Sequence, residues 1–405
     1  MIKSSTVTLK FANAEKKRQL KSFVNEYRNV LAFLIDELWD VEKVSQLIPK
    51  SITSKAQTWL TARAVQCAAK QASAIVRGTK RKNGQRRWRC EKLLAEGKVA
   101  KAQKLQSIID KHEESKPSVG TICPELDSRF VQFDLHNATT FDVWLTLGSL
   151  GNKLKLKLPF KRHKHFNGLM KRGALKQGVR LLDREASFAF DLPDVPKRKG
   201  GSTLGIDVGS RRVFATSAGQ LSKACNHGHT MASIQAKMSR KRKGSVGFRK
   251  TQTHRTNHIN WSLNQLNTND VQTLICEDIK HLRKNKVTNR HNTHWTYADI
   301  FGKLESLCEE RGVLVQRTAP AFTSQRCSQC AWVHEDNRDD VHFQCTACGH
   351  TADADLNAAI NIALQLPKLK GASQRTGFHW GAENGEQHVV PHARKETKSR
   401  RTRSS

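Results

Sequence analysis

The sequence CSQCAWVHEDNRDDVHFQCTACGHTADADLNAAINIA, residues 327–363, contains two C-x-x-C pairs, followed by two aspartates at the start of an Ala-, Leu- and Ile-rich run. Two turns that each present two thiolates suit tetrahedral Zn²⁺. Fourteen residues separate Cys330 from Cys345, slightly fewer than the roughly 15 to 20 usual for this pattern. Because cysteines fill all four positions, we expect Cys327, Cys330, Cys345 and Cys348 to hold one structural zinc ion with no open place for a reactive water.

The composition of the chain predicts a polyanionic partner. Its 405 residues include 70 Lys and Arg against 36 Asp and Glu, a formal net charge of +34, and so strong a basic excess is typical of nucleic-acid-binding proteins. No stretch approaches the roughly 18 consecutive apolar residues that cross a bilayer, and MIKSSTVTLKF lacks the apolar core of a signal peptide. We therefore expect a soluble, intracellular protein without a membrane partner.

Two roles are compatible with a zinc unit in such a basic chain. It can contact nucleic acid, or it can serve only to hold the segment that leads to Asp355. The other six cysteines are scattered singly, which favours a metal site over a disulfide framework. Four histidines, His254, His258, His291 and His294, are better explained as polar or phosphate-facing residues than as ligands, because no cysteine or acid accompanies them at a diagnostic spacing.

Two acids interrupt apolar runs that predict buried strands. Asp207 lies within STLGIDVGS, between Ile206 and Val208, and Glu277 ends the run VQTLICE. A charge in a buried strand is costly unless it binds a metal or is paired, so both acids are candidate functional residues. Asp278 follows Glu277, but adjacent residues of a strand face opposite sides, and Glu277 lies nearer the strand.

A third acid comes from the two aspartates that open the Ala-rich run. Asp353 and Asp355 are two residues apart, which is about 200° around an α-helix, so they cannot both face one site. Either of them can instead be the acid at the helix N-terminus, where the helix dipole favours negative charge.

The first half of the chain divides by periodicity. Apolar residues at spacings of three and four from Leu20 to Leu38 predict a long amphipathic helix, and helical composition continues to about residue 113. Period-two alternation at 141–147, 154–160 and 188–192 predicts strands, which a strand at 6–11 would complete. The expected fold class is therefore α/β with an α+β N-terminal half. Residues 191–202, DLPDVPKRKGGS, have the composition of a linker.

A strand acid, a second strand-end acid seventy residues later, the C-x-x-C pairs and D-x-N-A-A-x-N-I together resemble the RuvC-type nuclease domain of the TnpB family. These transposon-encoded, RNA-guided DNA endonucleases are ancestral to compact type V CRISPR effectors. The segments TSQRCSQC, FQCTACGH and WTYADIFGKL also fit that family, and the match covers residues 202–364.

The resemblance implies an RNase H-like fold in which Asp207, Glu277 and Asp355 hold two Mg²⁺ ions for phosphodiester hydrolysis, beside one zinc ion on the four cysteines. It implies a guide RNA and a target DNA as partners, with base pairing and a short adjacent motif selecting the target. It also implies a location in the prokaryotic cytoplasm, near the nucleoid.

A domain layout follows from the resemblance, more loosely in the N-terminal half, where only the architecture matches. It assigns 1–11 and 114–196 to a β-barrel wedge domain, 12–113 to a helical recognition domain, and 202–364 to the nuclease domain, with a zinc-finger insertion at 322–352 that binds target nucleic acid. We expect residues 366–405 to form a basic, disordered tail. Phosphate contacts are expected from KMSRKRKGSVGFRK, through Lys241, Arg242, Lys243, Arg249 and Lys250.

Other functions remain open on the sequence. A DDE-type transposase shares the fold and the metal ions but joins DNA strands. A non-cleaving nucleic-acid-binding repressor needs none of the three acids, although all are present. GIDVGS is also typical of actin-like ATPases, but the Gly-rich loops that such a protein needs downstream are not evident near residue 277. The sequence specifies neither the guide RNA nor the oligomeric state.

Overall fold

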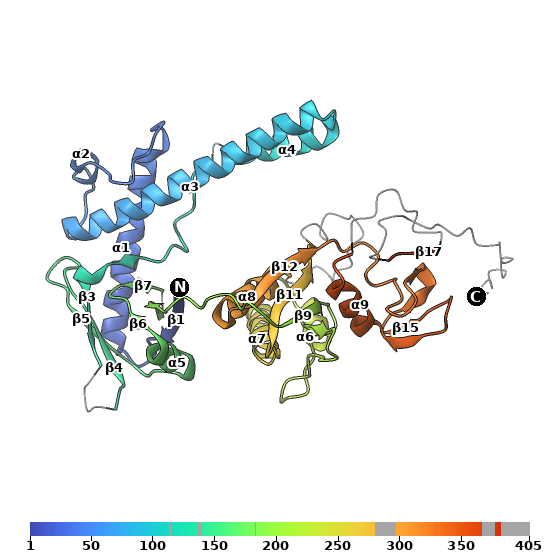
Figure 1. Cartoon of the computed structure of the whole chain (residues 1–405). Coiled ribbons are helices and arrows are strands. Elements are labelled where there is room, and N and C mark those ends of the chain that lie inside the picture. The colour runs from blue at the N-terminus through green and yellow to red at the C-terminus, as the bar shows by residue number, and fades with distance from the viewer. Residues whose placement is uncertain (114, 136–139, 183, 280–296, 367–376, 382–405) are drawn as a thin grey trace, which may run out of the picture. The chain divides into compact units, whose positions relative to one another are not determined.

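The computed structural model describes residues 1–113, 115–135, 140–182, 184–279, 297–366 and 377–381, and it contains two compact units, residues 1–193 and 194–405 (Figure 1). Among the described residues, no helix has the length and apolar character needed to cross a bilayer.

Unit 1 contains five helices and eight strands among its described residues. In chain order these are β1 (Ile2–Thr8), α1 (Ala14–Trp39), α2 (Lys50–Thr53), α3 (Ala62–Ala95), α4 (Val99–Glu113), β2 (Glu125–Leu126), β3 (Val131–Asp134), β4 (Val143–Leu147), β5 (Leu156–Phe160), α5 (Lys164–Arg172), β6 (Ala174–Leu175), β7 (Val179–Leu181) and β8 (Glu185–Asp191).

The strands of unit 1 form two antiparallel sheets. One has the order β1-β8-β7-β2, with β6 also paired to β8, and the other has the order β3-β4-β5. Phe188 of β8 joins the two sheets, because its ring stacks on Phe160 of β5 at 5.3 Å and meets Phe133 of β3 edge-on at 5.4 Å. Since the ladders do not close among the described residues, the predicted barrel takes the form of two sheets around one apolar core.

The first predicted strand is displaced along the chain. The alternation at 6–11 predicted a strand there, but β1 spans Ile2–Thr8 and pairs with β8 from Ile2 opposite Asp191 to Thr8 opposite Glu185. Pairing with β8 therefore decides the bounds, and Leu9 and Phe11 lie beyond the strand.

The helical block packs partly on the sheets and partly forms an arm. The buried face of α1 is the stripe predicted from Leu20 to Leu38, and Asn13 caps this helix by accepting a bond from the backbone N–H of Lys16. The main core includes α1 and the first part of α3, as far as Val76. Beyond that residue, α3 continues and pairs with α4 as an extended helical arm (Figure 1), around a small separate core of Cys90, Ala102 and Ile109.

Unit 2 contains the remaining elements. They are β9 (Ser202–Asp207), β10 (Ala215–Thr216), α6 (Met231–Ser239), α7 (Val246–Asn264), β11 (Val271–Glu277), α8 (Tyr297–Arg311), β12 (Leu314–Thr318), β13 (Trp332–Val333), β14 (Arg338–Asp339), β15 (His342–Gln344), β16 (Thr351–Asp353), α9 (Ala354–Ala363) and β17 (Phe378–His379).

The centre of unit 2 is a four-stranded mixed sheet with the order β10-β9-β11-β12. β9 is antiparallel to β10 and parallel to β11, which is parallel to β12. Leu204, Ile206, Leu274 and Cys276 share an apolar core with α6, α7 and α8. Because side chains alternate along a strand, the residues between and after them face the other side of the sheet, where α9 lies.

Gly205 lets α9 approach the sheet closely. A Cβ atom at this position would lie 2.1 Å from the carbonyl oxygen of Ala359 and 2.6 Å from the backbone nitrogen of Ala363. Only glycine avoids this overlap, so the close packing of α9 on β9 depends on it.

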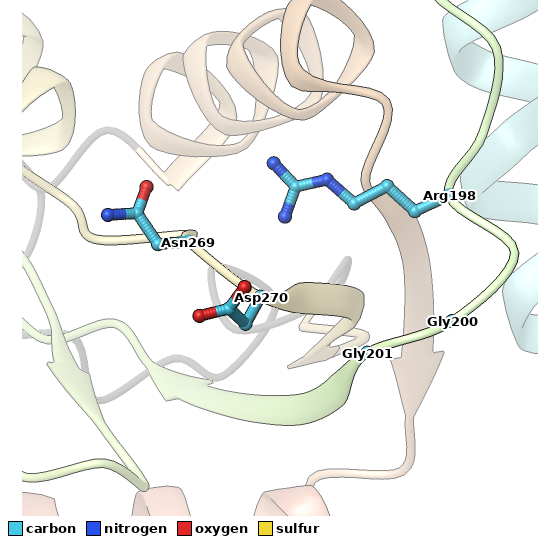
Figure 2. Close-up of a pocket in the computed structure, with 5 residues that line it drawn as sticks. All are labelled: Arg198, Gly200, Gly201, Asn269 and Asp270. Carbon is cyan, nitrogen blue, oxygen red and sulfur yellow. The ribbon is translucent and has the colours of Figure 1, made fainter.

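Arg198 anchors the chain at the other end of β9. Its guanidinium reaches towards the segment that leads into β11 (Figure 2) and donates hydrogen bonds to the carbonyl oxygens of Thr268, at 2.6 Å, and Val271, at 2.9 Å. It lines an open pocket with Gly200, Gly201, Asn269 and Asp270. Because these backbone carbonyls accept hydrogen bonds from the guanidinium, Arg198 holds the linker against the end of the sheet.

The end of the chain corrects one expectation. The prediction of a disordered segment over 366–405 is wrong for residues 377–381, where β17 pairs with β13 and Phe378 and Trp380 are buried against Val333. The basic composition of the segment concealed two aromatic residues at strand spacing. They cover apolar surface on the loop of residues 322–350, called the zinc loop after the metal that its cysteines are expected to bind. Residues 367–376 and 382–405 lie outside the described part of the chain.

Replacing Gly205 with Ala is expected to destabilise unit 2 by about 1–3 kcal/mol, because the added methyl group forces α9 away from β9. The melting temperature of the full chain, measured by calorimetry, should fall by several degrees. Gly302→Ala is the matched control: Gly302 lies in α8 with no atom within 4 Å of an added Cβ, so alanine should raise the melting temperature slightly. Equal melting temperatures for both variants would contradict the packing argument.

Candidate active site and zinc site

Two of the predicted acids end neighbouring parallel strands. Asp207 is the last residue of β9 and Glu277 the last residue of β11, and the register pairs Ile206 with Cys276. Both acids therefore follow a matched pair of core residues and face the opposite side of the sheet, towards α9. The structure brings these two together as the sequence predicted.

The structure assigns different roles to the two aspartates at the start of α9. Asp353 is the N-cap, since its carboxylate accepts hydrogen bonds from the backbone N–H groups of Asp355, at 3.0 Å, and Leu356, at 3.3 Å. Asp355 is the second residue of α9, and its charge contributes to raising the pKa of Asp207. The residue pattern left both aspartates open and the resemblance pointed to Asp355, which is the one that lies near Asp207.

Burial makes two of the three carboxyl groups, those of Asp207 and Glu277, hard to ionise. Burial raises the pKa of Asp207 to about 8, with repulsion from Glu277 and then Asp355 adding to the shift, while Arg338 opposes it. Burial likewise raises the pKa of Glu277 to about 7, against the opposing effects of a hydrogen bond from Thr323 and the charge of Arg338. A divalent cation would relieve this repulsion, and hard carboxylate oxygens are the ligands that Mg²⁺ prefers. The residues present therefore fit such an ion.

Two arginines at this site were not anticipated from the sequence. Arg338 of β14 places Nη2 2.9 Å from Oδ1 of Asp355, and Arg212 places Nη1 2.6 Å from Asp353 and 3.8 Å from Asp355. Arg338 lies between the two C-x-x-C pairs, in DNRDD, where no local pattern separates it from the many other arginines of the chain. Only the fold shows that it faces a carboxylate.

The acids open onto a pocket of about 320 Å³, lined by Asp207, Gly209, Ser210, Arg338 and Asp355 among others. Glu277 is buried and does not line the pocket; its carboxylate accepts a hydrogen bond from the hydroxyl of Thr323. Arg211 and Asp340, which form an ion pair, also line the pocket, so it presents three carboxylates and two guanidiniums, with Glu277 behind them.

The four predicted zinc ligands converge. Cys327 and Cys348 place their sulfurs 3.8 Å apart, Cys330 and Cys345 place theirs 3.5 Å apart, and all four lie within 4.8 Å of one another. Four thiols at this spacing fit tetrahedral zinc. Within the described ranges no other group of three or more His, Cys, Asp or Glu residues brings its ligating atoms so close, so the three carboxylates are more widely spaced than the thiols.

A buried polar network connects the cysteine loop to the acids. Thr323, which donates to Glu277, offers its carbonyl oxygen to Nδ2 of Asn361 in α9, at 3.0 Å. Arg326 donates to Oδ1 of Asn361, at 2.6 Å, and to the carbonyl of Trp380, at 2.6 Å. Asn357, on the same helix, accepts from the backbone N–H of Ser328, at 3.0 Å. The D-x-N-A-A-x-N pattern therefore supplies one acid and two amides that bind the zinc loop.

The predicted phosphate-binding residues divide between exposed and engaged side chains. Lys241 is half-buried and donates to the carbonyl of Gly247, at 3.2 Å, and to the hydroxyl of Thr251, at 2.9 Å, so it closes the turn before α7. The other four, Arg242, Lys243, Arg249 and Lys250, are exposed and stay predictions. His291 and His294 lie outside the described residues.

Comparisons with known proteins agree with the resemblance found in the sequence. Residues 297–362 match the family model described as "Cas12f1-like, TNB domain". A "CRISPR-associated endodeoxyribonuclease Cas12f1" of Sulfoacidibacillus thermotolerans is 32% identical over 158 residues, 39% of this chain and 36% of that protein. A "TnpB-like protein aq_aa05" of Aquifex aeolicus is 30% identical over 95 residues, 22% of this chain and 31% of that protein. The resemblance to TnpB-like proteins and compact CRISPR endonucleases is thus confirmed.

The extent of these matches is limited. The chain spans about a third of the length of the curated relatives named here. Among solved structures, one titled "Cryo-EM structure of the Cas12f1-sgRNA-target DNA complex" aligns over 90% of this chain and 98% of that chain, with 14% identity and a TM-score of 0.43.

The hydroxyl of Thr323 is expected to favour the ionised, cation-binding form of the Glu277 carboxyl group and to fix its orientation. Thr323→Val removes a hydrogen bond to a buried carboxylate, which is worth about 1.5–3 kcal/mol, and raises the pKa of Glu277 further. The Kd for Mn²⁺, measured by electron paramagnetic resonance at neutral pH, should increase about ten- to hundredfold. Thr323→Ser keeps the hydroxyl and should retain the affinity. Weakened binding in the serine variant alone would rule out this role.

The pKa values also predict how stability depends on pH when no divalent cation is added. The folded-state pKa of Asp207, about 8, lies above its ordinary value of 3.8, so its contribution to stability is complete below 3.8 and is lost as pH rises through 8. Asp207→Asn should therefore raise the melting temperature at pH 8 by a few degrees and flatten its decline from pH 5. Asp270→Asn, at an exposed turn before β11, should follow the wild type. An unchanged pH slope in Asp207→Asn would contradict the crowding of the three acids.

Proposed function

We propose that this chain is an RNA-guided DNA endonuclease whose nuclease site is formed by Asp207, Glu277 and Asp355. The observation that carries the proposal is the convergence of three carboxyl groups where β9, β11 and α9 meet: burial, with repulsion from Glu277 and Asp355, raises the pKa of Asp207, and burial raises the pKa of Glu277. Such crowding is costly in a protein that binds no cation there. The names of the relatives, a CRISPR-associated endodeoxyribonuclease and a TnpB-like protein, support the same activity.

The side chains of the pocket suggest how a phosphodiester would be bound and cut. Mg²⁺, proposed to bind as two ions, would supply Lewis-acid polarisation of the phosphate and a lowered pKa for the attacking water. Asp207 and Asp355 face the pocket and would hold this charge at its wall, while Glu277, fixed by Thr323, would hold it from behind. Arg338, released from Asp355, has the fork of donors that suits a phosphate oxygen. In this proposal the zinc held by Cys327, Cys330, Cys345 and Cys348 has a structural role.

The basic charge of the chain supports the choice of substrate. A net charge of +34 favours two nucleic-acid partners over one small molecule. In the proposed assembly, a guide RNA selects the DNA by base pairing, and unit 1 supplies the wedge and recognition functions. The zinc loop and the exposed residues Arg242, Lys243, Arg249 and Lys250 would contact phosphates. The proposed setting is the prokaryotic cytoplasm, at the nucleoid.

The proposal is tested first by the RNA that the protein retains. The full chain, purified from cells that carry its native locus, should contain one discrete RNA whose variable end directs cleavage of a plasmid bearing the complementary sequence. Products in which a transposon end is joined to the plasmid would instead indicate a DDE-type transposase. Retention of plasmid without any strand break, under conditions in which Mg²⁺ is present, would indicate a repressor.

The three acids are tested by single substitutions. Asp207→Ala, Glu277→Ala and Asp355→Ala should each reduce the cleavage rate at least about a thousandfold, because each removes a ligand of the metal centre, while target binding in a mobility-shift assay stays within about twofold. Asp353→Asn is the matched control, since asparagine also caps helices and should keep most activity. Equal cleavage by Asp207→Ala and the wild type would end the assignment.

A further inference from the structure

The distal half of α3 carries an exposed tryptophan in a strongly basic segment. Trp88 is 63% exposed, although burying an indole is normally favourable. Residues 77–92 contain eight Lys or Arg and one acid, Glu91. This segment lies beyond Val76, where the main core of unit 1 ends, on the arm that α3 forms with α4 (Figure 1). Trp88 is therefore not a core residue that the edge of the main core leaves partly uncovered.

The cations nearest to Trp88 share its face of the helix. Arg77, Arg81, Trp88 and Lys92 are spaced by four, seven and four residues, which are whole turns of an α-helix, so they form one stripe along α3. The face opposite this stripe is the one that packs on α4, through Cys90 and the small core of the arm. Arg81 and Lys92 are exposed, and the amine of Lys92 lies 5.6 Å from the centre of the indole ring.

The composition of the stripe favours a nucleobase over a protein surface. A protein interface that buries a tryptophan normally surrounds it with other apolar side chains. The stripe offers none: its remaining members are cations, with Gln85 and Gly84 between Arg81 and Trp88. One flat ring flanked by cations one and two helical turns away is the combination that stacks a base and neutralises the adjacent phosphates. A second copy of the arm would bring like charges together.

We propose that the Arg77–Lys92 face of α3 binds a single-stranded nucleic acid, with Trp88 stacking on an unpaired base and Arg81 and Lys92 contacting the flanking phosphates. The proposal deepens the proposed function by naming a segment that contacts unpaired nucleotides. It does not depend on catalysis, because the site lies on unit 1 and contains none of the three acids. The strand bound can belong to RNA or to displaced DNA, which share the stacking base and the phosphate.

The test uses the full chain, freed of nucleic acid and without divalent cations, and measures binding of labelled rU12, dT12 and a 12-base-pair duplex by fluorescence anisotropy. Trp88→Ala should raise the Kd for single strands about five- to hundredfold, because stacking is lost, and should change the Kd for duplex less than about twofold. Trp88→Phe should recover most of the affinity. A larger loss on rU12 than on dT12 would identify RNA as the bound strand, and the reverse would identify DNA.

Controls separate stacking from charge and from folding. Leu94→Ala removes an exposed apolar side chain of the same helix away from the stripe and should leave every Kd unchanged. Arg81→Gln should weaken all three probes and reduce the salt slope by about 0.7 on single strands. Helical content and melting temperature of each variant, followed by circular dichroism, identify any variant that is misfolded.

Cross-linking gives a second, independent readout in the unmodified protein. An rU12 that contains 5-iodouridine, irradiated in complex with the wild-type chain, should attach to the peptide that carries Trp88. Cross-links confined to other peptides, with an unchanged Kd for Trp88→Ala, would overturn the proposal. So would a Trp88→Ala variant that changes the oligomeric state in light scattering and leaves single-strand binding intact. A chain that binds as predicted but never cuts DNA would retain this proposal and refute the nuclease.

Discussion

The burial of acidic side chains where two strands and a helix meet is the constraint on which the site of unit 2 depends. Asp207 and Glu277 leave the same face of the sheet because both follow core residues on neighbouring parallel strands in register. Asp355 joins them because α9 lies on that face, and Gly205 is the residue that lets it lie so close. Burial, with repulsion from the two neighbouring carboxylates, raises the pKa of Asp207, and burial raises the pKa of Glu277. Folding therefore works against the ionisation of these groups, and a bound divalent cation is what would compensate for it.

The zinc loop explains how such a cluster is held in place. Four thiols converge within one loop. Residues before the first C-x-x-C pair and within it bind α9 through Asn357 and Asn361. Thr323, at the start of this loop, is bonded to both Glu277 and α9. The loop that carries the cysteines therefore also helps to orient the acids, because it contacts both Glu277 and α9. Trp380 closes the network from the far end of the chain by accepting a bond from Arg326.

Unit 1 handles charge in a different way. Its core includes the two sheets, α1 and the first part of α3, whereas the basic stretch of α3 extends beyond this core on an arm with little apolar surface to bury. Exposed cations remain hydrated and available to phosphates. The acids proposed to bind metal in unit 2 and the cations proposed to bind phosphate on unit 1 are therefore separate sets of residues.

The sequence by itself determined the elements whose pattern is local. The stripe of α1, the strands at 143–147 and 156–160, the strand positions of Asp207 and Glu277, and the four cysteines all follow from periodicity, from the cost of burying a charge and from thiolate spacing. The mixed sheet with two adjacent acid-bearing strands was implied by family resemblance. These features need only a few neighbouring residues to be recognised.

The tertiary structure alone decided the rest. It separated Asp353, which caps α9, from Asp355, which the resemblance had assigned to the site and which the residue pattern alone left open. It placed Arg338 at the acids, Thr323 against Glu277, and Phe378 and Trp380 on the zinc loop. Each of these contacts joins residues distant in sequence, so its energy depends on where α9, β14 and the loop meet. A pattern of neighbouring residues holds no information about that meeting point, which the packing of the whole unit determines.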